Sequence, residues 1–215
     1  MIRFLGVAGV VLGIAASVVP NDAGAVNVIL NGGFEGGVHS NGGNPSVPNG
    51  WTSSAGFDAF PLFNQVVTAA PLVHSGNSAL QIGNASNQTL ASISQSFLDV
   101  AGGLYTVSFW VFVPSQAPVG ANQLTVFVNS SGLTLNNYVA PYTQQSFTFV
   151  GTGGLDTLTI SGFNNSTFFY VDDVSVGPAP TPLPPTWTMM LIGLAGVGFI
   201  TYRRSNGGSR TIAAA

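Results

Sequence analysis

The chain has 215 residues, of which four are Lys or Arg, seven are Asp or Glu and none is Cys. Residues 26–177 contain six acids and no Lys or Arg, so this segment carries a formal charge of −6. A surface without cations cannot neutralise phosphates, which excludes nucleic acid as a partner. The lack of cysteine excludes disulfides, thiol catalysis and thiolate metal sites.

Residues 1–25 have the three parts of a secretory signal peptide. Arg3 supplies the positive start, residues 4–19 are uncharged and apolar, and Ala23-Gly24-Ala25 offers a small-x-small cleavage site. The alternative is an uncleaved anchor helix, but the apolar run is short for one. We therefore expect this segment to be removed on export.

Period-two alternation recurs between residues 26 and 176, whereas helical periodicity is hard to find. Runs rich in Val, Ile, Thr, Phe and Tyr are separated by turn residues such as Gly102-Gly103. About eight strands without crossover helices predict an all-β fold, an antiparallel jelly-roll β-sandwich over residues 26–177. Residues 31–50, rich in Gly, Asn and Pro, are expected to form a long loop. The expected strands are 27–30, 79–82, 90–98, 104–113, 123–128, 145–150, 155–161 and 168–176.

Alternation along residues 104–113 separates two faces of one strand. The face expected to point into the core is uniformly apolar or aromatic: Tyr105, Val107, Phe109, Val111 and Val113. The opposite face is mixed, with Trp110 and Phe112 at one end.

Six short motifs follow one another through the middle of the chain. They are NGGFE at 31–35, PNGW at 48–51, HSGNSAL at 74–80, SQSF at 94–97, GLYTVSFW at 103–110 and YVDDVSV at 170–176. In this order they resemble the carbohydrate-binding-module jelly rolls of the galactose-binding-like superfamily. The resemblance implies a sandwich of eight to ten strands that binds glycans rather than cleaving them.

Asp172 shares a face of the last expected strand with Tyr170 and Val174, so it is expected to point inward at the edge of the sheet. A lone inward carboxylate is costly without a cation or a metal, and Ca²⁺ favours carboxylate and carbonyl oxygens. The resemblance implies a structural calcium held by Glu35 and Asp172, with Ser75 or Asn77 from the Ser-Gly-Asn turn. Hydrogen-bonded or solvated carboxylates without metal are the alternative, and Asp173 is expected at the surface.

Glycan binding needs aromatic faces for stacking on sugars and polar groups for their hydroxyls. Tyr138 and Tyr142 are flanked by polar loop residues and are expected at the surface. Trp110 is the third candidate for ligand binding. For Trp110 and Trp51 a place in the core is the alternative, since the resembled family packs its core there.

The C-terminal segment begins with Pro182-Leu183-Pro184-Pro185-Thr186-Trp187 and continues as an apolar run that ends at Tyr202-Arg203-Arg204. The 16 residues from Trp187 to Tyr202 would form a helix of about 24 Å, which is short for a hydrocarbon core of about 30 Å. We predict a Pro-rich linker and sorting motif at 178–186, a transmembrane helix at 187–202 and a basic cytoplasmic tail at 203–215.

This layout resembles the PEP-CTERM sorting tail of exopolysaccharide-producing Gram-negative bacteria. The motif positions are Pro182, Pro184, Pro185, Trp187, Arg203 and Arg204, while the glutamate of the family's motif is missing. The resemblance implies transient anchoring in the inner membrane, cleavage by an exosortase-like sorting protease, and release to the cell surface or extracellular matrix.

Catalysis finds little support in the sequence. A glycosidase needs two carboxylates in a cleft, and neither His39 nor His74 accompanies a nucleophile motif. We therefore predict a non-catalytic exported protein that associates with exopolysaccharide or cell-wall glycan through its jelly-roll domain. A structural biofilm or matrix component without a defined ligand is the alternative, and a glycan hydrolase comes third.

Overall fold

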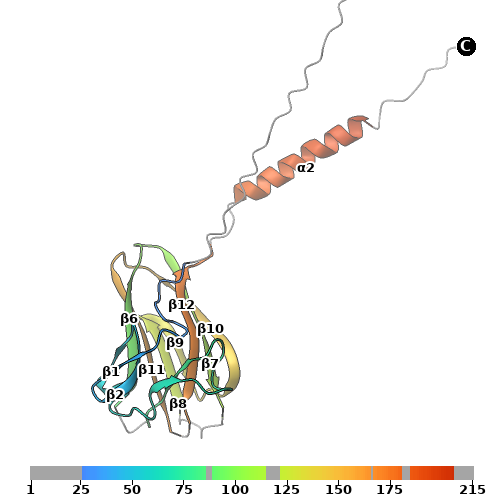
Figure 1. Cartoon of the computed structure of the whole chain (residues 1–215). Helices are drawn as coiled ribbons and strands as arrows, with labels where there is room; N and C mark the ends of the chain where they lie inside the picture. The colour runs from blue at the N-terminus through green and yellow to red at the C-terminus, as the bar shows by residue number, and fades with distance from the viewer. Residues whose placement is uncertain (1–25, 86–88, 115–121, 166, 181–184, 206–215) are drawn as a thin grey trace, which may run out of the picture.

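The computed structural model describes residues 26–85, 89–114, 122–165, 167–180 and 185–205. The described chain folds as two five-stranded antiparallel sheets packed face to face, with a separate two-stranded hairpin (Figure 1). The predicted all-β sandwich is therefore confirmed.

The first sheet has the strand order β10-β7-β12-β5-β4 and the second has the order β3-β6-β11-β8-β9. The first sheet consists of β10 (Ala140–Val150), β7 (Leu104–Val113), β12 (Phe169–Pro178), β5 (Ala79–Ile82) and β4 (Gln65–Val67). The second consists of β3 (Thr52–Ser53), β6 (Ala91–Leu98), β11 (Leu155–Asn164), β8 (Asn122–Val128) and β9 (Ser131–Asn136). The hairpin is β1 (Val38–Asn41) with β2 (Asn44–Pro48), and a single helical turn, α1 (Ala55–Asp58), precedes β4.

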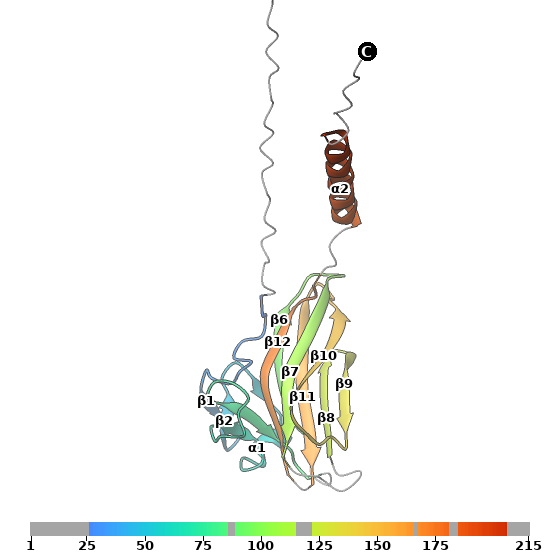
Figure 2. The same ribbon diagram turned by 90° about the vertical axis from the view of Figure 1, so that its right-hand side faces the viewer.

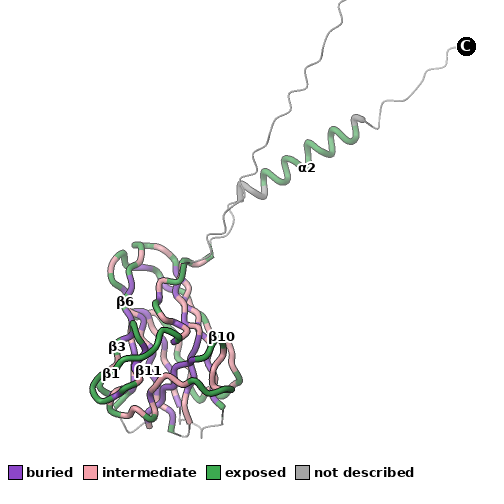
Figure 3. The backbone as a smooth tube through the Cα atoms, viewed as in Figure 1, coloured by how far each residue is buried: buried purple, intermediate pink, exposed green. Residues whose placement is uncertain are grey.

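The hydrophobic core lies between the two sheets, as the buried segments in Figure 3 show. On β7 the alternation holds over the whole strand, because the five side chains expected to face the core are all buried. On the facing sheet, Leu158 and Ile160 of β11 and Leu124 of β8 have no exposed surface. Strands β6, β7 and β8 thus contribute every second residue to one apolar layer, and this layer is the main source of stability for a domain without disulfides.

Several strand predictions agree with the structure, and others do not. The ranges 79–82 and 104–113 coincide with β5 and β7. Residues 27–30 do not form a strand, although the backbone N–H of Val28 donates to the carbonyl of Val176 at 2.8 Å. The expected loop at 31–50 contains the β1–β2 hairpin. The strands that the alternation missed are short or polar, so few of their residues contribute to the apolar pattern.

The C-terminal run forms α2 (Pro185–Ser205), which lies apart from the sandwich (Figures 1 and 2). Its large apolar side chains from Met189 to Tyr202 are exposed. No helix in the described ranges is both long and apolar enough to cross a membrane. The prediction of a transmembrane helix at 187–202 is therefore not supported, since the apolar run is short and its three glycines and Thr201 lower its hydropathy.

The other predictions for the two ends of the chain cannot be compared with the fold. The signal peptide at 1–25 lies outside the described residues, as do Pro182 and Pro184 of the sorting motif. The side chains of Pro185, Trp187 and Arg204 are also not described, and Arg203 is exposed.

Three fully buried asparagines, Asn44, Asn64 and Asn84, hold the irregular segment between β3 and β5. Asn64 Nδ2 donates to Asn84 Oδ1 at 2.6 Å, and Asn84 Nδ2 donates to the carbonyls of Gly56 and Thr89 at 2.8 and 2.6 Å. These amides satisfy backbone groups that no strand partner reaches. They replace the regular hydrogen-bond ladder where the chain leaves the sheets.

We expect Asn84→Ala to lower the free energy of unfolding by about 2 kcal/mol, because it leaves the buried carbonyl of Gly56 and the part-buried carbonyl of Thr89 without this donor and removes the shortest acceptor of the Asn64 amide. Asn136→Ala, which removes an exposed amide from the edge strand β9, should change it by less than about 0.5 kcal/mol. Urea denaturation of both variants measures the difference. Equal losses in the two would contradict a stabilising role for the buried amides.

Candidate functional site

The outer face of the first sheet carries the side chains that the core does not use. Its neighbouring strands β7 and β12 pair antiparallel, and Tyr170 lies opposite Phe112, Asp172 opposite Trp110 and Ser175 opposite Ser108. All six side chains lie on the side of the sheet away from the core.

A β-bulge in β12 places Asp172 on this face. The register shifts between Asp172 and Ser175, and Asp173 has a positive φ of 50°. Val171 and Val174 therefore both point into the core although they are three positions apart, an odd spacing that unbroken alternation would place on opposite faces. The expectation that Asp172 points inward from a sheet edge was wrong, because β12 is a central strand and its alternation changes phase at the bulge.

Aromatic rings gather at one end of the face. The Trp110 ring stacks on the His74 ring with centroids 3.9 Å apart. Tyr142 lies 5.1 Å from His74 and 5.3 Å from Phe112, and Phe112 lies 5.8 Å from Tyr170. His74, Trp110, Phe112 and Tyr142 are partly exposed, so we name these four residues the aromatic cluster.

The Asp173 carboxylate fixes His74 over Trp110. Its Nδ1 lies 2.7 Å from Asp173 Oδ2, and Ser75 Oγ donates to Asp173 Oδ1 at 2.7 Å. The Asp173 side chain is 33% exposed, so this contact is accessible to solvent. Asp173 is at the surface as expected, but it has a defined structural role there.

The four residues predicted to hold calcium come together around the turn at 74–78. Asp172 has no exposed surface, and its Oδ2 accepts the backbone N–H groups of His74 at 3.0 Å and Ser75 at 3.1 Å. Glu35 Oε1 accepts the backbone N–H groups of Asn77 at 2.6 Å and Ser78 at 2.7 Å. Ser75 and Asn77 therefore contact the carboxylates through their backbone N–H groups.

Burial raises the pKa of Asp172, the nearby charge of Asp173 adds to this rise, and the N–H bonds from Ser75 and Asp173 oppose it. The pKa of Tyr142 is raised by burial and then by the charges of Asp172 and Asp173. The described residues contain no group of three or more His, Cys, Asp or Glu that could hold a metal ion. Any cation here would therefore need backbone carbonyl or water oxygens in addition to carboxylates.

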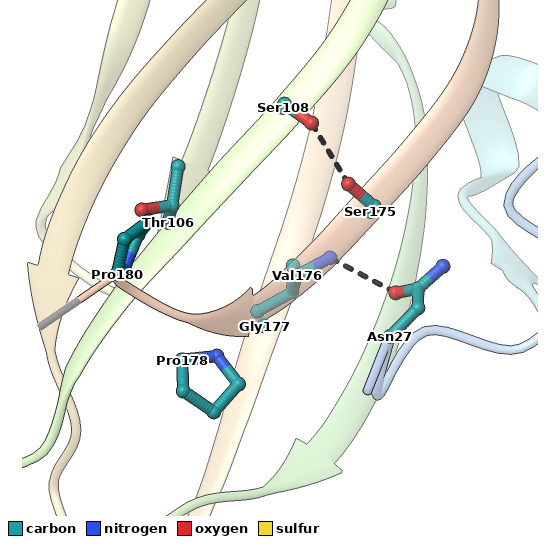
Figure 4. Close-up of a pocket in the computed structure, with 8 residues that line it drawn as sticks. All are labelled: Asn27, Thr106, Ser108, Ser175, Val176, Gly177, Pro178 and Pro180. Atoms are coloured by element: carbon teal, nitrogen blue, oxygen red, sulfur yellow. Dashed lines mark hydrogen bonds between the residues drawn. The ribbon is translucent and has the colours of Figure 1, made fainter. Parts of the chain in front are cut away.

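A hollow of about 200 Å³, lined by hydroxyl and amide groups together with apolar atoms, continues the same face toward the end of β12 (Figure 4). In it Ser108 Oγ and Ser175 Oγ are 2.8 Å apart, and Asn27 Oδ1 accepts the N–H of Val176 at 3.0 Å. The lining residues are Asn27, Thr106, Ser108, Ser175, Val176, Gly177, Pro178 and Pro180. The hydroxyl groups among them can both donate hydrogen bonds to a ligand and accept them from it.

The structure separates the three residues predicted to bind a ligand. Trp110 and Tyr142 belong to the aromatic cluster, and the Tyr142 hydroxyl donates to the carbonyl of Leu72 at 2.8 Å. Tyr138 lies between β9 and β10, where it is partly buried against the core and bonded to Asn122. Trp51 is only 3% exposed and is a core residue.

The residues predicted to bind a ligand did not include His74, Ser108 or Ser175. His74 is isolated in the sequence, and only the fold brings it onto Trp110. A signal for the two serines was available, since Ser108 alternates with Trp110 on the face of β7 that does not enter the core.

Comparisons with models of protein families and with curated proteins give no match. Among solved structures, the fold is similar to a carbohydrate-binding module, CBM61, in complex with β-1,4-galactotriose. That match has a TM-score of 0.52 and 17% identity, and it covers 72% of this chain and 100% of the module. A family 16 carbohydrate-binding module has a TM-score of 0.49 and 13% identity, with 70% of this chain and 99% of that module covered. A CBM4 module has a TM-score of 0.47 and 18% identity, with coverages of 70% and 99%. At these identities the likeness to CBM61 shows the fold alone, a jelly roll of the carbohydrate-binding-module type.

Substitution of Asp172 tests whether its carboxylate fixes the 74–78 turn. Asp172→Asn keeps the shape but turns an NH₂ group toward backbone N–H donors, so we expect a loss of about 1–3 kcal/mol in the free energy of unfolding. Asp173→Asn should change it by less than about 0.5 kcal/mol, because this side chain is partly exposed and Asn tolerates positive φ. Urea denaturation compares the two variants. An Asp172→Asn variant with unchanged free energy of unfolding would show that the Asp172 carboxylate does not stabilise the 74–78 turn.

Proposed function

We propose that the jelly-roll domain binds a glycan on the outer face of the first sheet. The observation that carries the proposal is the continuity of the aromatic cluster with the hydroxyl-lined hollow. Trp110 and Ser108 are alternate residues of β7, and Asp172 and Ser175 lie beside them on β12. Rings for stacking on sugar C–H groups thus adjoin hydroxyls for sugar hydroxyls. A module of the same fold has been solved with a galactotriose.

The size of the face suits a short stretch of polysaccharide. From Phe112 to Thr106 along β7 the face extends over about 20 Å at roughly 3.3 Å per residue. His74 covers one side of Trp110, so the partly exposed rings of His74, Phe112 and Tyr142 supply the stacking surface on that end. The ligand we propose is therefore a chain lying along the strands rather than a single sugar in a deep cavity.

The charge of the face favours an uncharged glycan. Asp173, partly exposed, and Glu35, exposed, lie beside the aromatic cluster, and the sequence has no Lys or Arg between Arg3 and Arg203. Uronic-acid or sulfated polysaccharides would be repelled rather than paired. A neutral exopolysaccharide or cell-wall glycan meets no such barrier.

We propose that this binding is non-catalytic. Glycoside hydrolysis requires one carboxylic acid and a second free carboxylate on opposite sides of the scissile bond. On this face Asp172 is fully buried and Asp173 holds His74 and Ser75, while Glu35 accepts two backbone N–H bonds. We therefore assign these carboxylates to stabilising the turn at 74–78 and not to acid–base or nucleophilic catalysis.

Structural calcium at Glu35 and Asp172 remains our proposal for the turn at 74–78. The carboxylate oxygens keep lone pairs beyond the N–H bonds that they accept, and carbonyl oxygens of the turn could complete a shell of hard ligands. The N–H bonds are the competing explanation, since they stabilise the two carboxylates without a metal. When bound, the ion would supply positive charge beside Asp172 and rigidity to the turn.

Glycan binding is tested with the full-length protein and immobilised neutral and anionic polysaccharides. We expect saturable binding to a neutral polysaccharide, weakened about tenfold or more by Tyr142→Ala or Trp110→Ala through loss of stacking and packing. Phe127→Ala, which removes a partly exposed ring from the outer face of the second sheet, should leave affinity unchanged. Absence of saturable binding across neutral polysaccharides would favour a structural matrix component without a defined ligand.

We propose further that the protein is exported and sorted to the cell surface or extracellular matrix. The support lies in the sequence, in residues 1–25 and in the sorting-tail motif from Pro182 to Arg204. Intact-mass measurement of the protein from a producing cell should find both ends removed, the first after Ala25 and the second near Pro182–Trp187. A cytosolic chain with both ends intact would refute export.

A further inference from the structure

A second group of carboxylates lies at the end of the sandwich where two connections cross between the sheets. The turn at 99–103 joins β6 to β7, and the loop at 151–154 joins β10 to β11. The N–H of Gly102 donates to the carbonyl of Gly151 at 2.9 Å, and the N–H of Gly151 donates to the carbonyl of Gly103 at 2.8 Å. The two connections are thus hydrogen-bonded to each other.

Two carboxylates hold the loop at 151–154. Asp99 accepts the backbone N–H groups of Thr152 at 3.1 Å and Gly153 at 2.6 Å. Asp156 Oδ1 accepts Thr152 Oγ1 at 2.6 Å and Asn129 Nδ2 at 2.8 Å. Residues from both sheets therefore converge on Asp99 and Asp156.

Asp156 is 1% exposed, and its second oxygen is left over from these contacts. Among the described residues, Oδ2 of Asp156 has no hydrogen-bond partner and is closed to solvent. Both carboxyl groups contact Thr152, Asp99 through its backbone N–H and Asp156 through its hydroxyl. Burial raises the pKa of Asp156, but hydrogen bonding at its carboxyl group, from Thr152 and Asn129 among others, outweighs burial and lowers it. A buried carboxylate oxygen without a partner thus lies beside a second acid.

Further oxygens approach the same corner. The Cβ that an alanine would place at Gly151 would lie 2.7 Å from Asp99 Oδ2 and 2.7 Å from the carbonyl oxygen of Val100. Only a glycine permits this close approach, so these two oxygens stand close to one point. Asp99 is partly exposed, which gives water access to the corner.

Two carboxylates that converge on one residue, here Thr152, repel each other unless a proton or a cation lies between them. The sequence supplies no Lys or Arg between Arg3 and Arg203. We propose that Asp99 and Asp156 bind a divalent cation of the calcium type, with Oδ2 of Asp156 as its buried ligand. The Val100 carbonyl and water would complete the oxygen shell, since Ca²⁺ commonly combines one or two carboxylates with carbonyl and water ligands. The ion would fix the turn at 99–103 to the start of β11 at this end of the second sheet.

The test uses full-length Glu35→Gln, so that calcium bound at Glu35 and Asp172 does not contribute. After chelation, added Ca²⁺ should raise its Tm by about 5–10 °C at a hundredfold excess over Kd. Adding Asp156→Asn should abolish that rise. This double variant should still fold in chelator, with a Tm no lower than that of Glu35→Gln, because the new amide can donate to Asp99. Asp99→Asn, changed at the partly exposed partner, should also abolish the rise.

The outcomes separate the two calcium proposals and the proton alternative. A Tm rise in Glu35→Gln that disappears with Asp156→Asn or Asp99→Asn supports the cation site. No rise in Glu35→Gln, or a rise that survives both substitutions, overturns it. A third outcome is a Tm that does not change with Ca²⁺ but is higher at pH 5 than at pH 7, and only in variants that retain Asp156. That outcome would indicate a proton shared by the two carboxylates and would also overturn the cation site. A chelator effect in wild type that Glu35→Gln removes belongs to the site at Glu35 and Asp172.

Discussion

A domain with six carboxylates and no Lys or Arg has to stabilise each buried acid with neutral donors or with an ion from solution. Backbone N–H groups meet most of this need. Asp172 accepts three of them, and Glu35 and Asp99 accept two each. All but one of these donors belong to turns remote in sequence, so the carboxylates act as clamps between distant parts of the chain. The turn at 74–78 is held in this way from two sides, by Glu35 and by Asp172.

The bulge in β12 connects this electrostatic constraint to the core. If the strand alternated without interruption, Asp172 and Val174 would lie on the same face, and one of them would be in the wrong environment. The extra residue, Asp173, lets Val171 and Val174 both enter the core while Asp172 faces outward. The same irregularity aims Asp173 at His74, which then stacks on Trp110. Core packing and the aromatic cluster therefore depend on one local departure from regular strand geometry.

The sequence determines the regular parts of the fold most clearly. Long strands such as β7 carry enough alternating residues for the face that enters the core to be identified, but their partners, β10 and β12 for β7, are remote in sequence and do not follow from the pattern. The short strands β3 and β4 and the polar hairpin β1–β2 give no such signal. The resemblance to the carbohydrate-binding modules, and not alternation, associated Glu35 and Asp172 with the 74–78 turn, whose backbone N–H groups make the contacts. Unbroken alternation along 170–176 predicts that Asp172 and Val174 share a face. The bulge at Asp173 changes the alternation between Val171 and Val174, so Asp172 lies on the opposite side of the sheet from the one predicted.

The two outer faces of the sandwich differ in a way that bears on binding. The second sheet presents mostly hydroxyls, for example Ser94 opposite Thr159, with the partly exposed rings of Phe127 and Phe163 among them. These residues keep a cation-free surface soluble. The first sheet instead combines four clustered rings with a hollow, which is the arrangement expected where a ligand replaces water.

Position along the chain adds a further constraint on the glycan face. Pro178 and Pro180 form one wall of the hollow, and the N–H of Ala179 donates to the carbonyl of Leu104 at 2.8 Å. The last residues of the domain are therefore part of the proposed binding face and not merely a tether. Cleavage near Pro182–Trp187, as we propose, would remove α2 but leave this wall in place. Cleavage before Pro180 would remove part of the lining of the hollow. The sorting motif therefore begins just beyond the last residues that the proposed binding face needs.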